Sequence, residues 1–254
     1  MTITTELVTE ALYRALEHSW PAAAVIEVSG WIVREGKGGG NRVSAASLAD
    51  PGLPGGEVPD IDLAEDRMSG LGQSPLFMIR TGEDPLDEAL DRRGYRIVDP
   101  VVILTAPASR VAVREPPGPD VSFCDAAMPI QARIWAEGGI GAARLAVMRR
   151  TTGPRVWILG RTAGRPAGAV FAAMHDGIAM AHALEVREGA RRRGLGASLM
   201  AAVAGWAVRN GARSLAVAVT RENTGACELY RTLGLVPGAR YHYRRKAGEK
   251  GERR

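Results

Sequence analysis

Three consecutive arginines and two glycines lie in the stretch from Arg191 to Gly196. An apolar segment precedes them, and a helical pattern follows with four apolar residues on one face, namely Leu195, Leu199, Val203 and Trp206. The first N–H groups of a helix lack internal partners and lie at the positive end of its dipole. Glycine there lets an anion approach these amides closely. The stretch therefore predicts a turn that binds a phosphate or pyrophosphate group.

Spacing separates three known kinds of phosphate-binding turn. The G-x-x-x-x-G-K-[ST] loop of nucleotide-hydrolysing enzymes does not occur in the sequence. The dinucleotide-binding G-x-G-x-x-G turn is excluded because Leu199 occupies its third glycine position and the following strand, 214–219, has no acidic residue. The third kind, [RQ]-x-x-G-x-[GA], matches Arg191 to Gly196 position for position. This turn is typical of the GNAT acetyltransferase superfamily, which the chain therefore resembles.

The resemblance continues toward the C-terminus. Residues 223–230 are similar to the family's N-x-x-A-x-x-L-Y segment, and residues 241–246 are similar to its closing strand, so the resemblance covers roughly residues 120–246. It implies an α/β fold with two acetyltransferase-like domains, each a mixed, mostly antiparallel sheet flanked by helices. The C-terminal domain would hold acetyl-CoA between two splayed strands. One departure is Glu188, which stands where the family often has proline.

The resemblance also implies which residues contact the coenzyme. We expect backbone contacts to the pantetheine arm from the end of the strand 177–186, and phosphate contacts from the amides of the turn. Asn223 would either contact the coenzyme or cap the following helix. The expected coenzyme-binding residues, besides Asn223, are Leu184, Val186, Arg191, Arg192, Arg193, Gly194, Leu195, Gly196 and Ala197.

Acyl transfer to an amine requires a neutral nucleophile, stabilisation of the charge that develops on the carbonyl oxygen, and a proton for the departing thiolate. Tyr230 matches the family tyrosine beside the thioester sulfur, so the resemblance implies that it is the general acid. A phenol with an ordinary pKa of about 10 keeps its proton at neutral pH.

The base is less directly indicated. Some relatives carry a glutamate twelve residues before the tyrosine, where this chain has Ala218. We expect Glu185 to be the base, because it is a carboxylate in an otherwise apolar strand. Strand alternation would place it on one face with the small residues at 179, 181 and 183. His182, His175 and a chain of water molecules stay as alternatives, and Cys227 has no histidine at motif spacing.

The N-terminal part, residues 1–110, is interpreted as a second, degenerate acetyltransferase-like domain, with an unrelated α/β extension as the alternative. A strand at 76–80, a helix from Asp84 that ends before Gly94, and a strand at 97–104 repeat the order of residues 214–246. This part has no [RQ]-x-x-G-x-[GA] turn, and Asp91 follows the helical Leu90 where a tyrosine would be needed. We therefore expect it not to bind the cofactor. A proline-rich linker at 111–119 would lead into the acetyltransferase domain at 120–246, and residues 247–254 would be a disordered basic tail.

Composition narrows the class of protein. Of 254 residues, 46% are hydrophobic and 24% charged, as in ordinary globular proteins, and no apolar run reaches the ~18 residues of a membrane span. The N-terminus does not resemble a signal peptide, and the four histidines lack metal-ligand spacing. We expect a cytoplasmic protein with two free cysteines and no metal or membrane partner.

Charge is divided unevenly along the chain. Residues 1–118 carry 11 Lys/Arg and 18 Asp/Glu, whereas residues 119–254 carry 22 and 10. A basic C-terminal half suits a polyanionic ligand such as coenzyme A. Nucleic acid is not expected, because the arginines cluster at one turn and the tail includes Glu249 and Glu252. The sequence thus predicts an N-acetyltransferase that moves an acetyl group directly from acetyl-CoA to a primary amine of a small molecule or a peptide or protein N-terminus. The alternative is a non-catalytic acyl-CoA-binding regulatory module.

Overall fold

The computed structural model describes residues 5–50, 57–113 and 120–246. Their contacts divide the chain into two compact units whose sequence ranges interleave. The first unit comprises residues 1–21, 102–219 and 223–239, and the second comprises 22–101, 220–222 and 240–254. These units differ from the contiguous ranges 1–110 and 120–246 that the sequence suggested. Residues 114–119 of the expected linker and the expected tail, 247–254, lie outside the described residues.

The first unit is built on a mixed sheet. Its strands lie in the order β11-β5-β10-β9-β8-β7-β6, with β5 contributing from Val102 and β11 as far as Ala239. The β6–β7, β7–β8 and β8–β9 pairs are antiparallel, and β9–β10 is parallel. The strands are β5 (Tyr95–Pro107), β6 (Val121–Cys124), β7 (Arg155–Thr162), β8 (Arg165–His175), β9 (Ile178–Val186), β10 (Ser214–Thr220) and β11 (Val236–Lys246).

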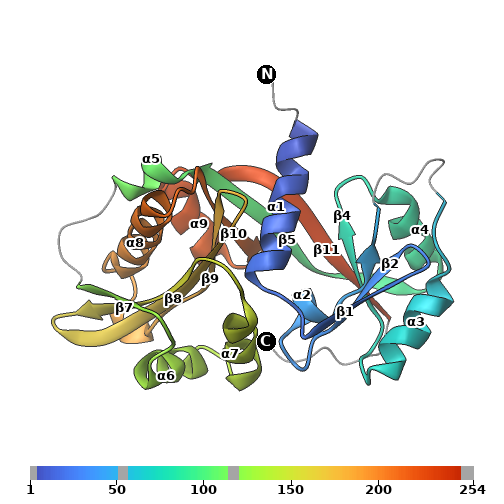
Figure 1. Ribbon diagram of the computed structural model, residues 1–254, viewed down its shortest axis with the longest axis horizontal. Coiled ribbons are helices and arrows are strands. Elements are labelled where there is room, and N and C mark those ends of the chain that lie inside the picture. The colour runs from blue at the N-terminus through green and yellow to red at the C-terminus, as the bar shows by residue number, and fades with distance from the viewer. Residues whose placement is uncertain (1–4, 51–56, 114–119, 247–254) are drawn as a thin grey trace. The chain divides into compact units, whose positions relative to one another are not determined.

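Helices cover both faces of this sheet (Figure 1). Helix α8 packs on the face that carries Val170 and Ala172, while α1 and α6 pack against β8 and β9 on the other face. Strand β8 is therefore nearly all apolar rather than alternating, as expected for a strand buried on both sides. The helices are α1 (Thr5–Ser19), α5 (Ala108–Ala112), α6 (Pro129–Glu137), α7 (Ala142–Arg150), α8 (Leu195–Arg209) and α9 (Thr224–Thr232).

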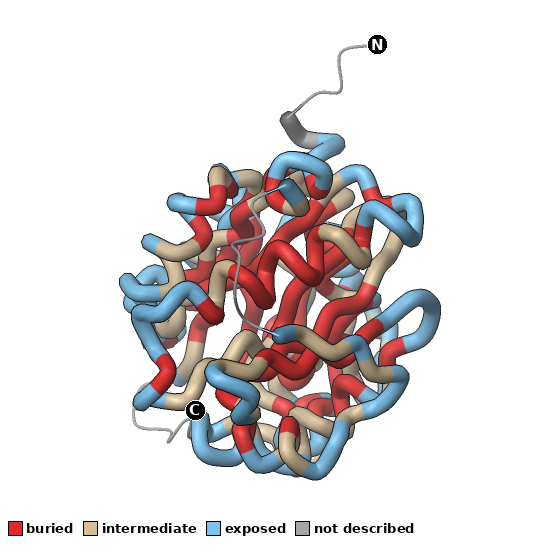
Figure 2. Tube along the Cα trace, turned by 90° about the vertical axis from the view of Figure 1, so that its left-hand side faces the viewer, coloured by how far each residue is buried: buried red, intermediate tan, exposed pale blue. Residues whose placement is uncertain are grey.

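The second unit combines a small sheet with a strand pair. Strands β1 (Ala24–Val28), β2 (Trp31–Glu35) and β3 (Ser47–Leu48) form an antiparallel sheet, and β4 (Leu76–Arg80) pairs antiparallel with residues 241–245 of β11. Its helices are α2 (Asn41–Ser44), α3 (Ile61–Gly70) and α4 (Asp84–Arg92). Trp31, Phe77 and Tyr95 lie in its core. In Figure 2 the buried residues follow the strands and the inner sides of helices, and the loops are exposed.

The order β4-α4-β5 repeats the order β10-α9-β11. Both helices are nine residues long, and each is followed by a glycine with left-handed backbone, Gly94 at φ +81° and Gly234 at φ +86°. Aligning these glycines places the fully buried Leu90, and not Asp91, at the position of Tyr230. In both repeats the last strand is divided between the units: β5 passes into the first unit at Val102, and β11 passes into the second at Arg240.

Candidate active site

The arginine–glycine turn connects β9 to α8. After a single 3₁₀ turn at Glu188–Ala190, the chain reaches Gly194, which has a left-handed backbone (φ +83°) and precedes the first helical residue. Glycine adopts this conformation without the strain that a side chain would add. The Gly194 carbonyl accepts the first intrahelical hydrogen bond, from Ser198 N at 3.0 Å. The N–H groups of residues 195–197 precede that bond and therefore lack helical partners.

The start of α8 packs closely against α9. A Cβ atom on Gly196 would lie 3.1 Å from Cδ2 of Leu229, so a larger residue would require the leucine end to move by a few tenths of an ångström. The approach brings the helix of Tyr230 next to the turn. Asn223 caps α9, because its Oδ1 accepts a hydrogen bond from Ala226 N at 3.1 Å. Of the two roles expected for Asn223, the structure contains the helix cap.

Strands β9 and β10 stop pairing before either of them ends. Their parallel register runs from Ile178 opposite Ser214 to Ala181 opposite Val217. Strand β9 continues to Val186, so the expected coenzyme-contacting residues Leu184 and Val186 lie on a segment that pairs with no residue of β10. Both side chains are half-buried and pack against the core below α8. The end of β9 thus offers backbone groups to an additional extended chain.

A bulge interrupts β9 at the same place. Phe171 pairs with His182 and Ala169 pairs with Glu185, so three steps along β9 match two steps along β8. Ala183, inside the bulge, has a left-handed backbone at φ +52°. The extra residue reverses the alternation, and Glu185 lies on the face of His182. The expectation that Glu185 shares a face with Ala179 and Ala181 is therefore wrong.

The Glu185 carboxylate is held from two sides. Its Oε1 accepts a hydrogen bond from Arg191 Nη2 at 3.1 Å, and its Oε2 lies against Gly138, directly after α6. Arg191 also donates from Nε to the Val186 carbonyl oxygen at 2.9 Å. The Arg191 side chain is thus bound to β9, and its backbone N–H donates to the Glu188 carbonyl oxygen at 3.2 Å. Arg192 and Arg193 are exposed at the surface of the turn.

Replacing Gly138 by alanine should displace Glu185, because the added Cβ atom would overlap the carboxylate. We expect acetyl-group turnover to fall about tenfold, since a carboxylate moved from its position is a poorer proton acceptor. The start of α8 is not touched, so acetyl-CoA affinity should stay within about twofold of wild type. The matched control is Gly141→Ala, where a Cβ atom meets nothing within 4 Å. Equal turnover in both variants would contradict a role for Glu185.

Tyr230 lies on α9 and is only 7% exposed. It belongs to the same core cluster as Leu195 of α8 and Val219 of β10, so it lies on the α8 side of the sheet, opposite the face of Glu185. Burial raises the pKa of the Tyr230 hydroxyl well above its ordinary value. The phenol therefore keeps its proton across the neutral range, as a proton donor must.

The histidines considered as alternative bases contact α1. His182 is 5% exposed, and its Nε2 lies 2.8 Å from Ser19 Oγ. Because Ser19 Oγ donates to the Ala15 carbonyl oxygen at 2.6 Å, it accepts from His182, which assigns the proton of that bond to Nε2. His175 stacks on His18 with ring centroids 3.6 Å apart. His182 faces the same side as Glu185, but its Nε2 already donates to Ser19.

Two features of the site were not expected from the sequence: the contact of Gly138 with Glu185, and a hydrogen bond from Trp135 Nε1 to the Ala183 carbonyl oxygen at 2.7 Å. Trp135 lies in α6, 48 residues before Ala183, and Gly138 directly follows that helix. The only local signal is the spacing of three residues, which places Trp135 and Gly138 on one side of a helix.

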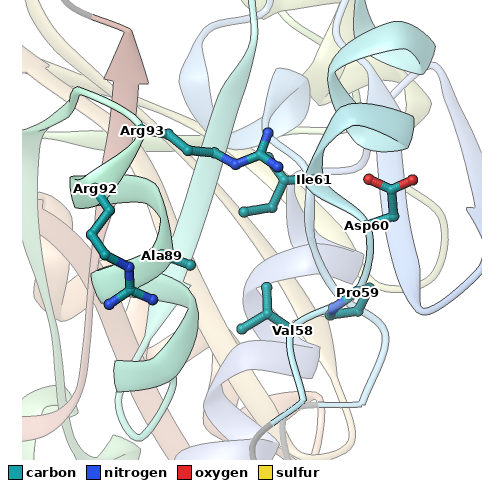
Figure 3. A pocket seen from close by; sticks show the side chains of 7 residues that line it. All are labelled: Val58, Pro59, Asp60, Ile61, Ala89, Arg92 and Arg93. Carbon is teal, nitrogen blue, oxygen red and sulfur yellow. The ribbon is translucent and has the colours of Figure 1, made fainter.

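A hollow of about 350 Å³ lies in the second unit, between the start of α3 and the end of α4 (Figure 3). Asp60 caps α3 by accepting from Asp62 N at 3.0 Å, and Arg93 pairs with Asp62 and Glu65. A carboxylate therefore already occupies this helix start, which does not favour an anion. The lining residues are Val58, Pro59, Asp60, Ile61, Ala89, Arg92 and Arg93, and none was expected to bind the cofactor.

Among the described residues, no helix is long and apolar enough to cross a membrane. Cys124 and Cys227 are both free thiols.

Comparison with known proteins agrees with this geometry. Residues 125–235 match the model of the acetyltransferase (GNAT) family. A GCN5-related N-acetyltransferase from Kribbella flavida superposes with a TM-score of 0.72 at 19% identity, covering 98% of this chain and 97% of that one. A functionally unknown conserved protein from Staphylococcus epidermidis ATCC 12228 gives 0.65 at 12% identity, covering 89% and 95%. No curated protein sequence matches the chain.

A tandem GNAT protein from the clavulanic acid biosynthesis pathway superposes with a TM-score of 0.60 at 14% identity, covering 97% of this chain and 94% of that one. Identities this low show a shared fold, and the fold is shared over nearly the whole length. Residues 125–235 are thus similar to the GNAT acetyltransferase family, and the fold of the chain is similar to that of a tandem GNAT protein.

Proposed function

We propose that this chain is an N-acetyltransferase that moves an acetyl group from acetyl-CoA directly to a primary amine. The observation that carries the proposal is the end of β9, which pairs with no residue of β10 beyond Ala181. The turn before α8 follows this strand end, and Glu185 lies on the face of the sheet opposite α8. The pantetheine arm is an extended chain with two amides, and it would pair with the free edge of β9. The pyrophosphate would be held by the amides of residues 192–197.

The residues that flank this strand end suit the transfer step. The amine nitrogen attacks the thioester carbonyl carbon, a C–N bond forms, and the C–S bond breaks. The amine gives up one proton to Glu185, directly or through water, and the sulfur leaves as a thiolate that takes the Tyr230 proton. Glu185 and Tyr230 lie on opposite sides of β9, so acceptor and leaving group would be served from different sides.

The test is a calorimetric titration with acetyl-CoA, followed by thiol release with a panel of primary amines that includes diamines, amino sugars and short peptides with free N-termini. Binding in the micromolar range with thiol release for at least one amine would support the proposal. Binding without thiol release for any of them would favour a non-catalytic acyl-CoA-binding module. No binding would contradict both.

A further inference from the structure

The end of α1 is joined to the sheet by two stacked histidines. The rings of His18 and His175 lie 3.6 Å apart between centroids and are inclined by only 5°. His18 lies in the last turn of α1, and His175 is the last residue of β8, so the contact links two segments of the first unit. His18 is exposed and His175 is half-buried, and protons can therefore reach the pair from water.

Hydrogen bonding fixes the neutral form of His18. Its Nδ1 lies 2.9 Å from the Arg14 carbonyl oxygen, which can only accept, so Nδ1 carries the proton and Nε2 of the neutral ring carries none. On the other ring, Nε2 of His175 lies 3.4 Å from Oδ2 of Asp176. That single carboxylate can balance one positive charge on the pair, but not two.

The surroundings oppose a second positive charge at this place. The charged side chains on the adjoining segments are two of each sign, namely Arg14 and Glu17 on α1, Asp176 in the turn after β8, and Arg213 before β10. Burial, and after it the nearby His18, lower the pKa of His175; Arg14 acts in the same direction, and Asp176 opposes them. Two protonated rings at stacking distance would repel each other.

The residues after His18 contact the sheet face that carries the candidate base. Ser19 Oγ lies 2.8 Å from Nε2 of His182, and the Trp20 ring lies 5.0 Å from the His182 ring. Thr151, directly after α7, donates from Oγ1 to the Ser19 carbonyl oxygen at 3.3 Å. The end of α1 therefore holds β9 and the end of α7 together, and the histidine stack is the outermost of these contacts.

We propose that the His18–His175 pair is a pH-sensitive switch, which keeps the end of α1 on the sheet while at least one ring is neutral and releases it when both are protonated. The proposal goes beyond the proposed function, because it requires neither coenzyme nor acceptor.

The direction of the pH dependence follows from proton binding. In the released segment both histidines would titrate near the ordinary pKa of about 6.5, whereas the packed pair resists the second proton. The packed form thus binds fewer protons at acid pH. Its stability is complete above about pH 6.5 and decreases as the pH falls below that value.

Amide hydrogen exchange along α1 measures the release directly. Exchange is followed by mass spectrometry at pH 7.5, 6.5 and 5.5 and corrected for the intrinsic pH dependence of amide exchange. Because release would take up about one extra proton, protection of residues 12–19 should fall about tenfold between pH 6.5 and 5.5. Protection of α8, on the opposite face of the sheet, should change by less than about threefold.

His18→Phe is the test variant, because phenylalanine keeps a flat ring for stacking and cannot be protonated. Its α1 protection at pH 6.5 and 5.5 should agree within about twofold. In this variant the pKa of His175, read from its ring signals by NMR, should rise, since one cause of its lowering is gone. If His18→Phe does not fold, His175→Phe removes the same pair from the sheet side, and the same loss of pH dependence is expected.

His242→Phe is the matched control. It also removes a histidine, but one whose Nε2 lies 2.7 Å from Asp87 in the second unit, so α1 should respond to pH as in wild type. Loss of α1 protection in wild type and in His242→Phe, but not in His18→Phe, supports the proposal. Constant α1 protection in wild type, or an equal loss in His18→Phe, overturns it. An equal loss in α8 would indicate general acid unfolding and would also overturn it.

Discussion

Replacing Gly196 by glutamate should weaken acetyl-CoA binding about 100-fold without unfolding the protein, which corresponds to about 2.7 kcal/mol. Gly196 is the second residue of α8, where the helix presents its free N–H groups. A carboxylate there would repel the pyrophosphate. The same carboxylate interacts favourably with the helix dipole, so the charge itself does not destabilise the helix.

The Cβ atom introduced at Gly196 must be accommodated by Leu229, whose Cδ2 would be 3.1 Å away. A flexible leucine end can move by the few tenths of an ångström required, so the thermal midpoint should change by only a few degrees, about 1 kcal/mol. Gly194 is a poorer choice for the same test. Its left-handed backbone would strain any side chain, and lost binding would then have two explanations.

Gly189→Glu is the control for charge alone. Gly189 lies in the 3₁₀ turn before the arginines, and a Cβ atom there meets nothing within 4 Å. It adds the same negative charge to the same connection but not at the helix start, so calorimetry should find acetyl-CoA affinity reduced by no more than about threefold. If the two glutamate variants bind acetyl-CoA equally well, the start of α8 is not the pyrophosphate site.

Local patterns in the sequence were enough to predict the elements of the site. The helix from Leu195, the turn before it and the strand up to Val186 all follow from residues that are neighbours in the chain. The resemblance to the GNAT family added the splay of β9 from β10 and the position of Tyr230. These features depend on short segments whose conformation is set mostly by their own residues.

The bulge in β9 could not be predicted in this way. Its left-handed residue is Ala183, which carries no glycine or asparagine signal for positive φ. The conformation is associated with an indole 48 residues earlier in the chain, and the pairing of distant residues is not visible in one sequence. Because the bulge reverses strand alternation, the prediction of the sheet face on which Glu185 lies was also wrong.

The division of the chain into two compact units could not be predicted from local sequence patterns either. A strand is recognised by its residues, but nothing in them says which sheet partner each half will have. Strand β11 reads as one closing strand, yet its residues 241–245 pair with β4 of the second unit. Proline density near 111–119 suggested a domain boundary there. The chain instead passes from one compact unit to the other within β5 and within β11.

Replacing Tyr230 by phenylalanine should lower acetyl-group turnover about 100-fold, the usual contribution of a positioned general acid. Phenylalanine keeps the ring in the cluster with Leu195, so we expect acetyl-CoA affinity within about threefold of wild type and an unchanged fold. Tyr95→Phe is the control, because it removes a hydroxyl from another buried tyrosine, in the second unit. Thiol release and calorimetry on the two variants separate chemistry from binding.

The pH dependence of turnover gives a second, independent test of Tyr230. Burial raises the pKa of its hydroxyl, so the folded protein keeps the phenol protonated through the range in which a free tyrosine ionises. Wild-type turnover should therefore not decline between pH 8 and about 10, where an exposed phenol would begin to lose its proton. The phenylalanine variant should be slower by the same factor throughout that range. A ratio of wild-type to Tyr230→Phe turnover that changes with pH in this range, or an equal loss in Tyr95→Phe, would show that the hydroxyl is not the proton donor to the leaving thiolate.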